Sequence, residues 1–129
     1  MATVRSHTRI NRPAEDVWNV VSDAGNIAAW FPAIKTSSAS ESARNCELAD
    51  GTRLTEDIVS NDPELRRFQY RITGGVPAED HLGTVDVLAD GGESMVVYTT
   101  EVRPDAIADT LGPVIEEGLQ GLKQYCESR

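Results

Sequence analysis

The sequence has 129 residues, 40% of them hydrophobic, and carries a formal net charge of −9 at pH 7. This length predicts one domain, residues 1–129, with a real core, and the acidity argues against nucleic acid or an anionic membrane surface as a partner. The sequence has no apolar run of 18 residues and no signal sequence, so we expect a soluble cytoplasmic protein without membrane insertion.

Cofactor and metal motifs are missing from the sequence. Cys46 and Cys126 lie far apart and form no CxxC motif, which argues against a disulfide framework and a zinc site. Glycine-rich phosphate loops, HExxH and GxSxG are also not found. We therefore expect no metal and no cofactor.

The chain begins with a predicted strand at residues 3–10, in which positions 4, 6, 8 and 10 share one face and the charged residues share the other. Two short helices are predicted next. The first starts near Pro13, which suits a first helical turn, and residues 22–25 break it. The second runs from residue 26 to residue 31 and stops at Pro32, because the residue before a proline avoids the α conformation.

Residues 35–103 predict an antiparallel meander. We expect a polar edge strand at 35–42, followed by strands at 44–48, 52–60, 64–73, 81–89 and 94–103. Asp50-Gly51 and Asp90-Gly91-Gly92 are typical of hairpin turns, because these residues tolerate positive φ. The loop at 74–80 is too long for a tight hairpin, which suggests mobility.

The last segment has apolar residues at helical spacing, from Ile107 to Cys126. Pro113 is unfavourable inside a helix. We therefore expect a short turn from Asp105, followed by a main helix that begins near Pro113. That helix would be about 22 Å long, and a strand of ten residues about 33 Å, so a long curved sheet can wrap around it.

Several segments, in this order, resemble one known family: Pro13 to Trp18, Ser22-Asp23, Trp30, Arg44, Leu48 to Gly51, Glu56, Arg67 to Ile72 and Gly118 to Lys123. They are similar to the START-like (SRPBCC) superfamily of polyketide cyclase/dehydrase and lipid transport proteins, to which the birch pollen allergen belongs. The resemblance implies an α+β helix-grip fold. In that fold a curved antiparallel sheet of about six or seven strands wraps around a long C-terminal helix, and two short helices lie between strands 1 and 2.

The chain departs from this family in two ways. His81 stands where such sequences often have tyrosine, and Tyr98 where they often have tryptophan. The segment before the last helix is also shorter, which affects how that end of the cavity closes.

Strand alternation places a set of polar side chains on the concave face, namely Arg44, Glu56, Tyr70, His81 and Tyr98. Their surroundings are apolar, as expected of a cavity for a hydrophobic ligand with a hydroxyl or carbonyl group. The other candidate ligand-binding residues are Trp30, Phe31, Phe68, Leu111, Ile115 and Leu119. Trp30 and Phe31 either fill the core or gate the cavity mouth together with the loop at 74–80.

Two residues are candidates for catalysis. Glu56, facing an apolar pocket, would act as a general acid or base if burial raises its pKa. The alternative is a structural ion pair with Arg44. His81 could move protons in a cyclisation or dehydration, and the alternative is a solvated histidine near a loop.

Three functions remain open from the sequence. The first is binding of a hydrophobic small molecule such as a polyketide, a sterol-like compound or a lipid. The second is catalysis of the cyclase or dehydratase type, and the third is a protein-interaction module. We expect a monomer or a homodimer.

Overall fold

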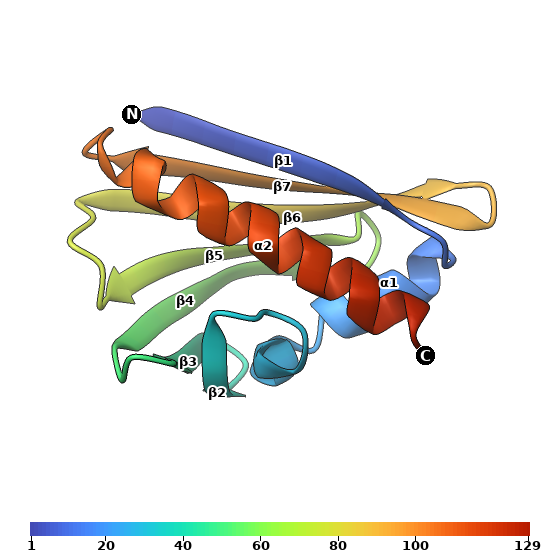
Figure 1. The fold of residues 1–129 in the computed structure, drawn as a ribbon, viewed down its shortest axis with the longest axis horizontal. Coiled ribbons are helices and arrows are strands. Elements are labelled where there is room, and N and C mark those ends of the chain that lie inside the picture. The colour runs from blue at the N-terminus through green and yellow to red at the C-terminus, as the bar shows by residue number, and fades with distance from the viewer.

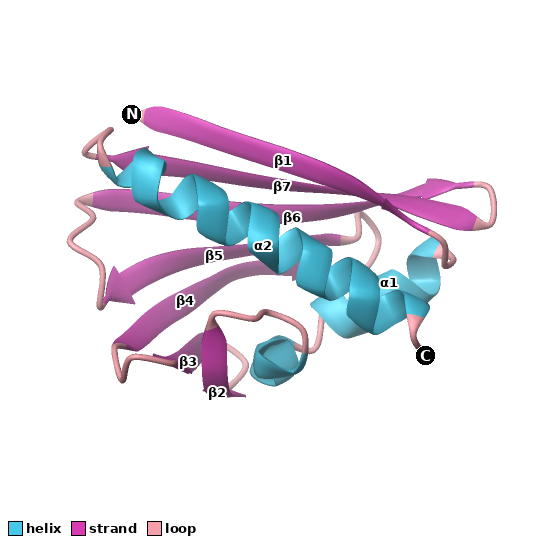
Figure 2. Ribbon diagram, viewed as in Figure 1, coloured by secondary structure: helices cyan, strands magenta, loops and turns pink.

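The computed structural model describes residues 1–129 and consists of a curved seven-stranded antiparallel sheet that faces one long helix (Figure 1, Figure 2). The strands lie in the order β1-β7-β6-β5-β4-β3-β2. The elements in chain order are β1 (Ala2–Ile10), α1 (Ala14–Val21), the 3₁₀ helix η1 (Ala24–Ala29), β2 (Ile34–Ala39), β3 (Ala43–Leu48), β4 (Arg53–Asp62), β5 (Arg67–Gly74), β6 (Asp80–Asp90), β7 (Glu93–Arg103) and α2 (Ile107–Glu127). The predicted α+β helix-grip fold is confirmed.

The two short helices lie between β1 and β2, as predicted, but the second differs from the prediction. It is a 3₁₀ helix that starts at Ala24 and ends at Ala29, with a kink at Asn26. A 3₁₀ helix has three residues per turn, so side chains three positions apart share a face. Ala24 and Ile27 have this spacing and both are buried, which explains the earlier start.

The turn before β5 is longer than predicted, so the strand starts at Arg67 instead of residue 64. The carboxylate Oδ1 of Asp62 accepts hydrogen bonds from the backbone N–H groups of Glu64, at 2.9 Å, and Leu65, at 3.1 Å. Arg66 then adopts a φ of 53°. These bonds replace the sheet ladder that the alternation pattern suggested.

The last helix is one continuous element from Ile107 to Glu127, so the predicted start near Pro113 is wrong. Pro113 lies inside the helix and is exposed. Its missing N–H leaves one helical hydrogen bond unmade, but the turns on both sides bury apolar side chains such as Leu111 and Ile115 against the sheet. This tertiary packing keeps the helix intact through the proline.

The core lies between the concave face of the sheet and α2, where side chains from β1, β3, β5, β6, β7 and all three helices form one buried cluster. The inward alternation predicted for β1 is confirmed, and β2 lies at the sheet edge, as predicted. Neither α1 nor α2 has the combination of length and apolar character that would allow it to cross a bilayer.

Candidate functional site

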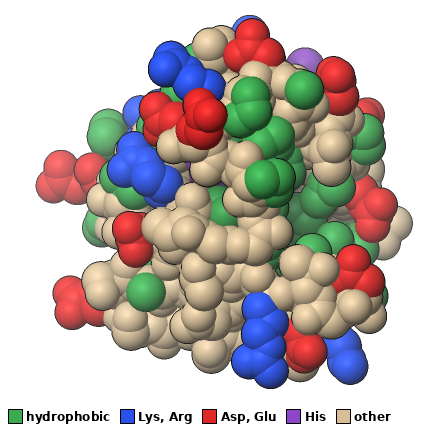
Figure 3. Space-filling view, turned by 90° about the vertical axis from the view of Figure 1, so that its left-hand side faces the viewer, with side chains coloured by type: hydrophobic (Ala, Val, Ile, Leu, Met, Phe, Trp, Pro, Cys, Tyr) green, Lys and Arg blue, Asp and Glu red, His purple; other side chains and the backbone are tan.

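A cavity of about 190 Å³ lies between the concave sheet face and the N-terminal half of α2. Its apolar walls come from η1 and the segment after it, from the strands β2 to β5, from the loop after β5, and from α2. The residues are Ile27, Phe31, Ala33, Ile34, Leu48, Leu54, Ile72, Val76, Leu111, Val114 and Ile115. Figure 3 views the end of the molecule where the loop after β5 and the start of α2 lie, and it shows hydrophobic side chains gathered around a hollow. The cavity therefore has an apolar mouth at this end.

Most of the residues predicted for the site meet in this cavity. Arg44, Glu56, Tyr70, His81, Tyr98, Phe31, Leu111 and Ile115 line it. Trp30 does not, because its buried ring packs behind Phe31, with a centroid distance of 5.6 Å. Phe68 and Leu119 are buried in the core outside the lining.

Arg44 and Glu56 form a buried ion pair in the cavity wall. They are direct cross-strand partners on β3 and β4, and Nε of Arg44 donates a 2.6 Å hydrogen bond to Oε1 of Glu56. The guanidinium carbon lies 5.1 Å from the centroids of both the Phe68 and Tyr70 rings, at cation–π distance. Phe68 thus acts on the site through Arg44.

Burial and mutual attraction pull the ionisation of this pair in opposite directions. Desolvation by burial raises the pKa of Glu56 above its ordinary value, and the charge of Arg44 only partly offsets this. Desolvation also disfavours the charged form of Arg44, but the charge and hydrogen bond of Glu56 outweigh it, so the pKa of Arg44 is raised. The carboxyl group is therefore a weaker acid than an exposed glutamate.

Tyr70 and Tyr98 share a hydrogen bond between their hydroxyl groups. Burial raises the pKa of Tyr98 to about 12 and that of Tyr70 well above its ordinary value, so both phenols stay neutral. One hydroxyl donates to the other, and the second O–H remains able to donate to a ligand. The Tyr70 ring lies over Gly83, where a side chain would collide with it.

His81 lies where β5 and β6 separate. The register of these strands runs from Arg67 with Asp86 to Tyr70 with Gly83 and then ends. Beyond it, the backbone N–H of Ile72 donates to Nδ1 of His81 at 3.0 Å, and Nε of Arg71 donates to the His81 carbonyl at 3.0 Å. Side chains thus replace the sheet ladder beside the cavity.

The surroundings of His81 hold it in one neutral form. Burial, aided by the charge of Arg71, lowers its pKa from 6.5 to about 4. Because Nδ1 accepts a hydrogen bond, the proton of the neutral ring sits on Nε2. The side chain is only 1% exposed, so the alternative of a solvated histidine is wrong. A role in proton transfer stays a prediction.

Thr100 is a cavity residue that sequence reasoning did not single out. It is completely buried, it lines the cavity, and its Oγ1 has no hydrogen-bond partner. An unpaired buried hydroxyl costs about 1–3 kcal/mol. Thr100 lies two positions after Tyr98, so strand alternation puts both on the concave face, but the lack of a partner is visible only in the structure. Val76 and Thr110 were missed because they lie outside the predicted strands.

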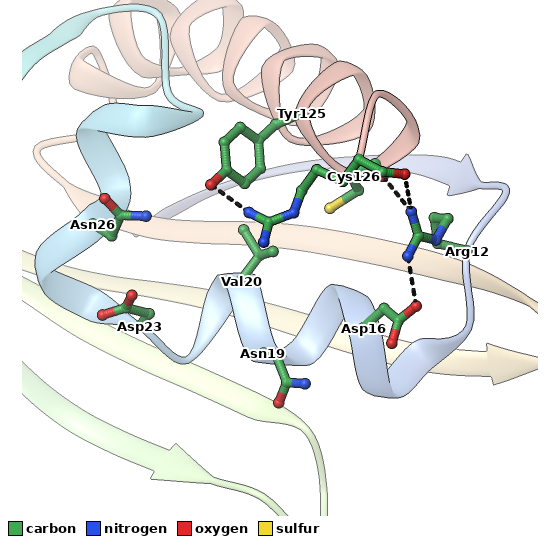
Figure 4. A pocket seen from close by; sticks show the side chains of 9 residues that line it. Arg12, Asp16, Asn19, Val20, Asp23, Asn26, Tyr125 and Cys126 are labelled. Carbon is green, nitrogen blue, oxygen red and sulfur yellow. Dashed lines mark hydrogen bonds and ion pairs between the residues drawn. The ribbon is translucent and has the colours of Figure 1, made fainter.

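A second hollow, of about 450 Å³, lies between α1, η1 and the end of α2 (Figure 4). It is polar and its arginines are already bonded. Arg12 donates to Asp16 at 2.8 Å and to the carbonyls of Cys126 and Arg129, and Arg129 donates to the Tyr125 hydroxyl. Burial raises the pKa of Cys126 to about 11, so its thiol is not activated. The apolar cavity is therefore the better candidate.

No group of three or more His, Cys, Asp and Glu side chains is arranged to hold a metal ion. Hydrogen-bonding groups and one ion pair make up the polar part of the cavity. These groups can orient a ligand, donate to an oxygen and accept a proton.

Comparison with known proteins identifies one family. The family model for polyketide cyclase/dehydrase and lipid transport proteins matches residues 1–127. No curated protein sequence matches this chain significantly.

Solved structures share the fold. A protein named XoxI from Bacillus cereus is 23% identical with a TM-score of 0.89, over 96% of this chain and 94% of its own. A protein from Thermobifida fusca is 27% identical with a TM-score of 0.78, over 97% and 93% of the two chains. The Zhui aromatase/cyclase from Streptomyces sp. R1128 is 19% identical with a TM-score of 0.80, over 98% and 94%.

These likenesses agree with the observed order of strands and helices, and the family model confirms the resemblance found in the sequence. Since the family model spans nearly all of the sequence, this chain belongs to the polyketide cyclase/dehydrase and lipid transport family.

Proposed function

We propose that this protein binds a compact hydrophobic small molecule in the cavity under α2. The observation that supports the proposal is an apolar interior cavity with a few convergent polar groups, which is the usual form of a small-molecule site. Membership of a family named for polyketide cyclases and lipid transport points to the same class of ligand.

The volume of the cavity favours small members of this class. A dry cavity of about 150 Å³ accepts benzene, whereas pockets for drug-sized ligands measure about 300–1,000 Å³. At about 190 Å³, this cavity suits one ring or two fused rings, or one end of a longer molecule that extends through the mouth. A four-ring sterol would require the walls to move.

Thermal unfolding in the presence of apolar aromatic compounds tests this proposal. A ligand at about 100 times its Kd adds about 2.7 kcal/mol to the free energy of unfolding, which raises Tm by several degrees for a domain of this size. Leu54 lines the cavity, so we expect Leu54→Trp to fill part of it and abolish the shift. The control is Val59→Trp, because Val59 is exposed on the same strand. Tm values that no compound raises would contradict binding.

A second candidate function is a cyclase or dehydratase reaction, and the buried carboxyl group of Glu56 beside the cavity favours it. In this reaction the Glu56 carboxylate takes a proton from the carbon next to a ligand carbonyl. A tyrosine hydroxyl donates to the resulting enolate oxygen. The protonated carboxyl group then returns the proton to a departing hydroxyl group, which leaves as water.

Substitution of Glu56 tests whether this residue acts as the base in a cyclase or dehydratase reaction. Glu56→Gln keeps a hydrogen-bond acceptor for Arg44 but removes the base, so turnover of a β-hydroxy ketone substrate should fall at least about a hundredfold. If Glu56→Gln does not fold, Glu56→Asp is the alternative test variant, because it keeps the negative charge but shortens the side chain. Asp57→Asn, on the exposed face of the same strand, should leave turnover unchanged. Full turnover in a folded Glu56→Gln protein would remove this residue from the mechanism.

A further inference from the structure

Thr100 lines the cavity, and its Oγ1 has no hydrogen-bond partner in the protein. Its cross-strand partners are Val4 on β1 and Gly83 on β6. The valine side chain has no polar atom and glycine has no side chain, so neither side chain can pair with Oγ1. The Tyr70 ring lies over Gly83, but its hydroxyl is bonded to that of Tyr98. The side chain is completely buried and lines the cavity. A ligand oxygen in the cavity could accept a hydrogen bond from this hydroxyl, which has no partner within the protein.

His81 provides a second donor next to Thr100. It lies on β6 two residues before Gly83, the partner of Thr100, so the two residues are diagonal neighbours on the concave face. Such neighbours are separated by about 7–8 Å, close enough for both side chains to reach one small group. Nδ1 is taken by the Ile72 N–H, so the N–H of the neutral ring is at Nε2 and has no partner in the protein.

The charges around the cavity indicate that the ligand is neutral. The Arg44 guanidinium is bound to Glu56 and lies 5.1 Å from the ring centroids of Phe68 and Tyr70, so its charge is already paired. An anionic ligand would be buried without a counter-ion, which is strongly unfavourable. A neutral oxygen that accepts hydrogen bonds has no such penalty.

We infer that Thr100 and His81 form a subsite that binds the carbonyl oxygen of a neutral one- or two-ring ligand, with Thr100 Oγ1 and His81 Nε2 as the donors. This inference rests on the proposed function and adds the chemical class of the ligand. The apolar walls hold the ring, and the oxygen points toward β6 and β7.

Three probes of similar size test the subsite by calorimetry: tetralin, which has no oxygen, 1-tetralone, which has a carbonyl, and 1-naphthoate, which is anionic. We expect 1-tetralone to bind the wild-type protein about tenfold more tightly than tetralin, and 1-naphthoate to bind most weakly. Equal affinity for tetralin and 1-tetralone, or a preference for 1-naphthoate, would overturn the subsite alone. If none of the three binds, the proposed function fails as well.

Variants of one strand then assign the effect to Thr100. Thr100→Val removes an unpaired hydroxyl while keeping the shape, so the protein should remain folded and lose about tenfold in affinity for 1-tetralone but none for tetralin. Thr100→Ser should restore most of the loss. Thr99→Val, on the opposite face of β7, should have no effect. Unchanged 1-tetralone binding by Thr100→Val would overturn the role of this residue.

Nitrogen NMR of the histidine rings tests His81 without a substitution. The Nε2 resonance of His81 should shift on addition of 1-tetralone and stay in place on addition of tetralin. A resonance that responds equally to both probes would overturn the donor role of His81.

Discussion

His81 occupies a position where a side chain substitutes for a sheet hydrogen bond. Its ring accepts the Ile72 N–H, and this contact requires an unprotonated Nδ1. Protonation would turn this atom from an acceptor into a donor. The contact therefore links the charge of one residue to the joint between β5 and β6.

This link predicts a pH dependence of stability. The pKa of His81 is lowered from 6.5 to about 4 on folding, so between these values the unfolded chain binds a proton that the folded protein does not. The contribution is complete above pH 6.5 and is lost as the pH falls toward 4, by at most about 3 kcal/mol. The pKa of Glu56 is raised above its ordinary value of 4.5 on folding. Just above pH 4.5, protonation of Glu56 therefore increases stability as the pH falls, which opposes the effect of His81.

Urea unfolding across this pH range checks the effect. In His81→Gln the stability should fall less steeply from pH 6.5 to pH 4 than in the wild type. His7→Gln is the control, because His7 is the other histidine and is exposed. Identical slopes for the wild type and His81→Gln would contradict the assignment.

At the scale of elements, glycines set the distance between α2 and the segment that follows η1. A Cβ on Gly118 would lie 2.6 Å from the Phe31 ring, and one on Gly121 would collide with the Trp30 carbonyl. These two positions explain how Trp30 and Phe31 lie directly beneath the helix. Since Phe31 lines the cavity, the packing of α2 also shapes the site.

Alanine substitutions in α2 should therefore have opposite effects at different glycines. Gly118→Ala forces Phe31 to move and should lower the free energy of unfolding by about 1–3 kcal/mol. Gly112→Ala meets only Val4, at 3.4 Å, and should raise it by about 0.5–1 kcal/mol through helix propensity. Chemical denaturation measures both. A Gly118→Ala protein as stable as the wild type would show that the contact with Phe31 is loose.

Helices and strands could be predicted from the sequence where neighbouring residues determine them. Pro13, the alternation in β1 and the Asp50-Gly51 turn mark boundaries that the structure reproduces within a residue or two. The start of α2 was not predictable in this way, because the local penalty of Pro113 is offset by packing against a sheet distant in sequence. The turn at Asp62 was misjudged because its side-chain hydrogen bonds compete with the strand.

At the scale of the whole molecule, the charge is unbalanced. The formal net charge is −9, and among the ion pairs only that between Arg44 and Glu56 is fully buried. Exposed pairs contribute little, whereas the excess of carboxylates repels itself in the compact state.

Salt should consequently stabilise this protein. Raising NaCl from about 10 mM to about 300 mM shortens the screening length from roughly 30 Å to below 10 Å, so Tm should rise by a few degrees at pH 7. Scanning calorimetry in NaCl and in KCl checks this and controls for specific ions. A Tm that falls with salt would mean that ion pairs outweigh the repulsion.

The sequence by itself determined the order of elements, the family resemblance and which polar residues share the concave face, because alternation and turn chemistry are local properties of the chain. Arg44, Glu56, Tyr70, His81 and Tyr98 could all be placed on that face in advance. Only the tertiary structure decided how they pair, that Trp30 lies behind Phe31, and that Thr100 has no partner. These features depend on strand register and on the close approach of α2, which bring together side chains far apart in the sequence.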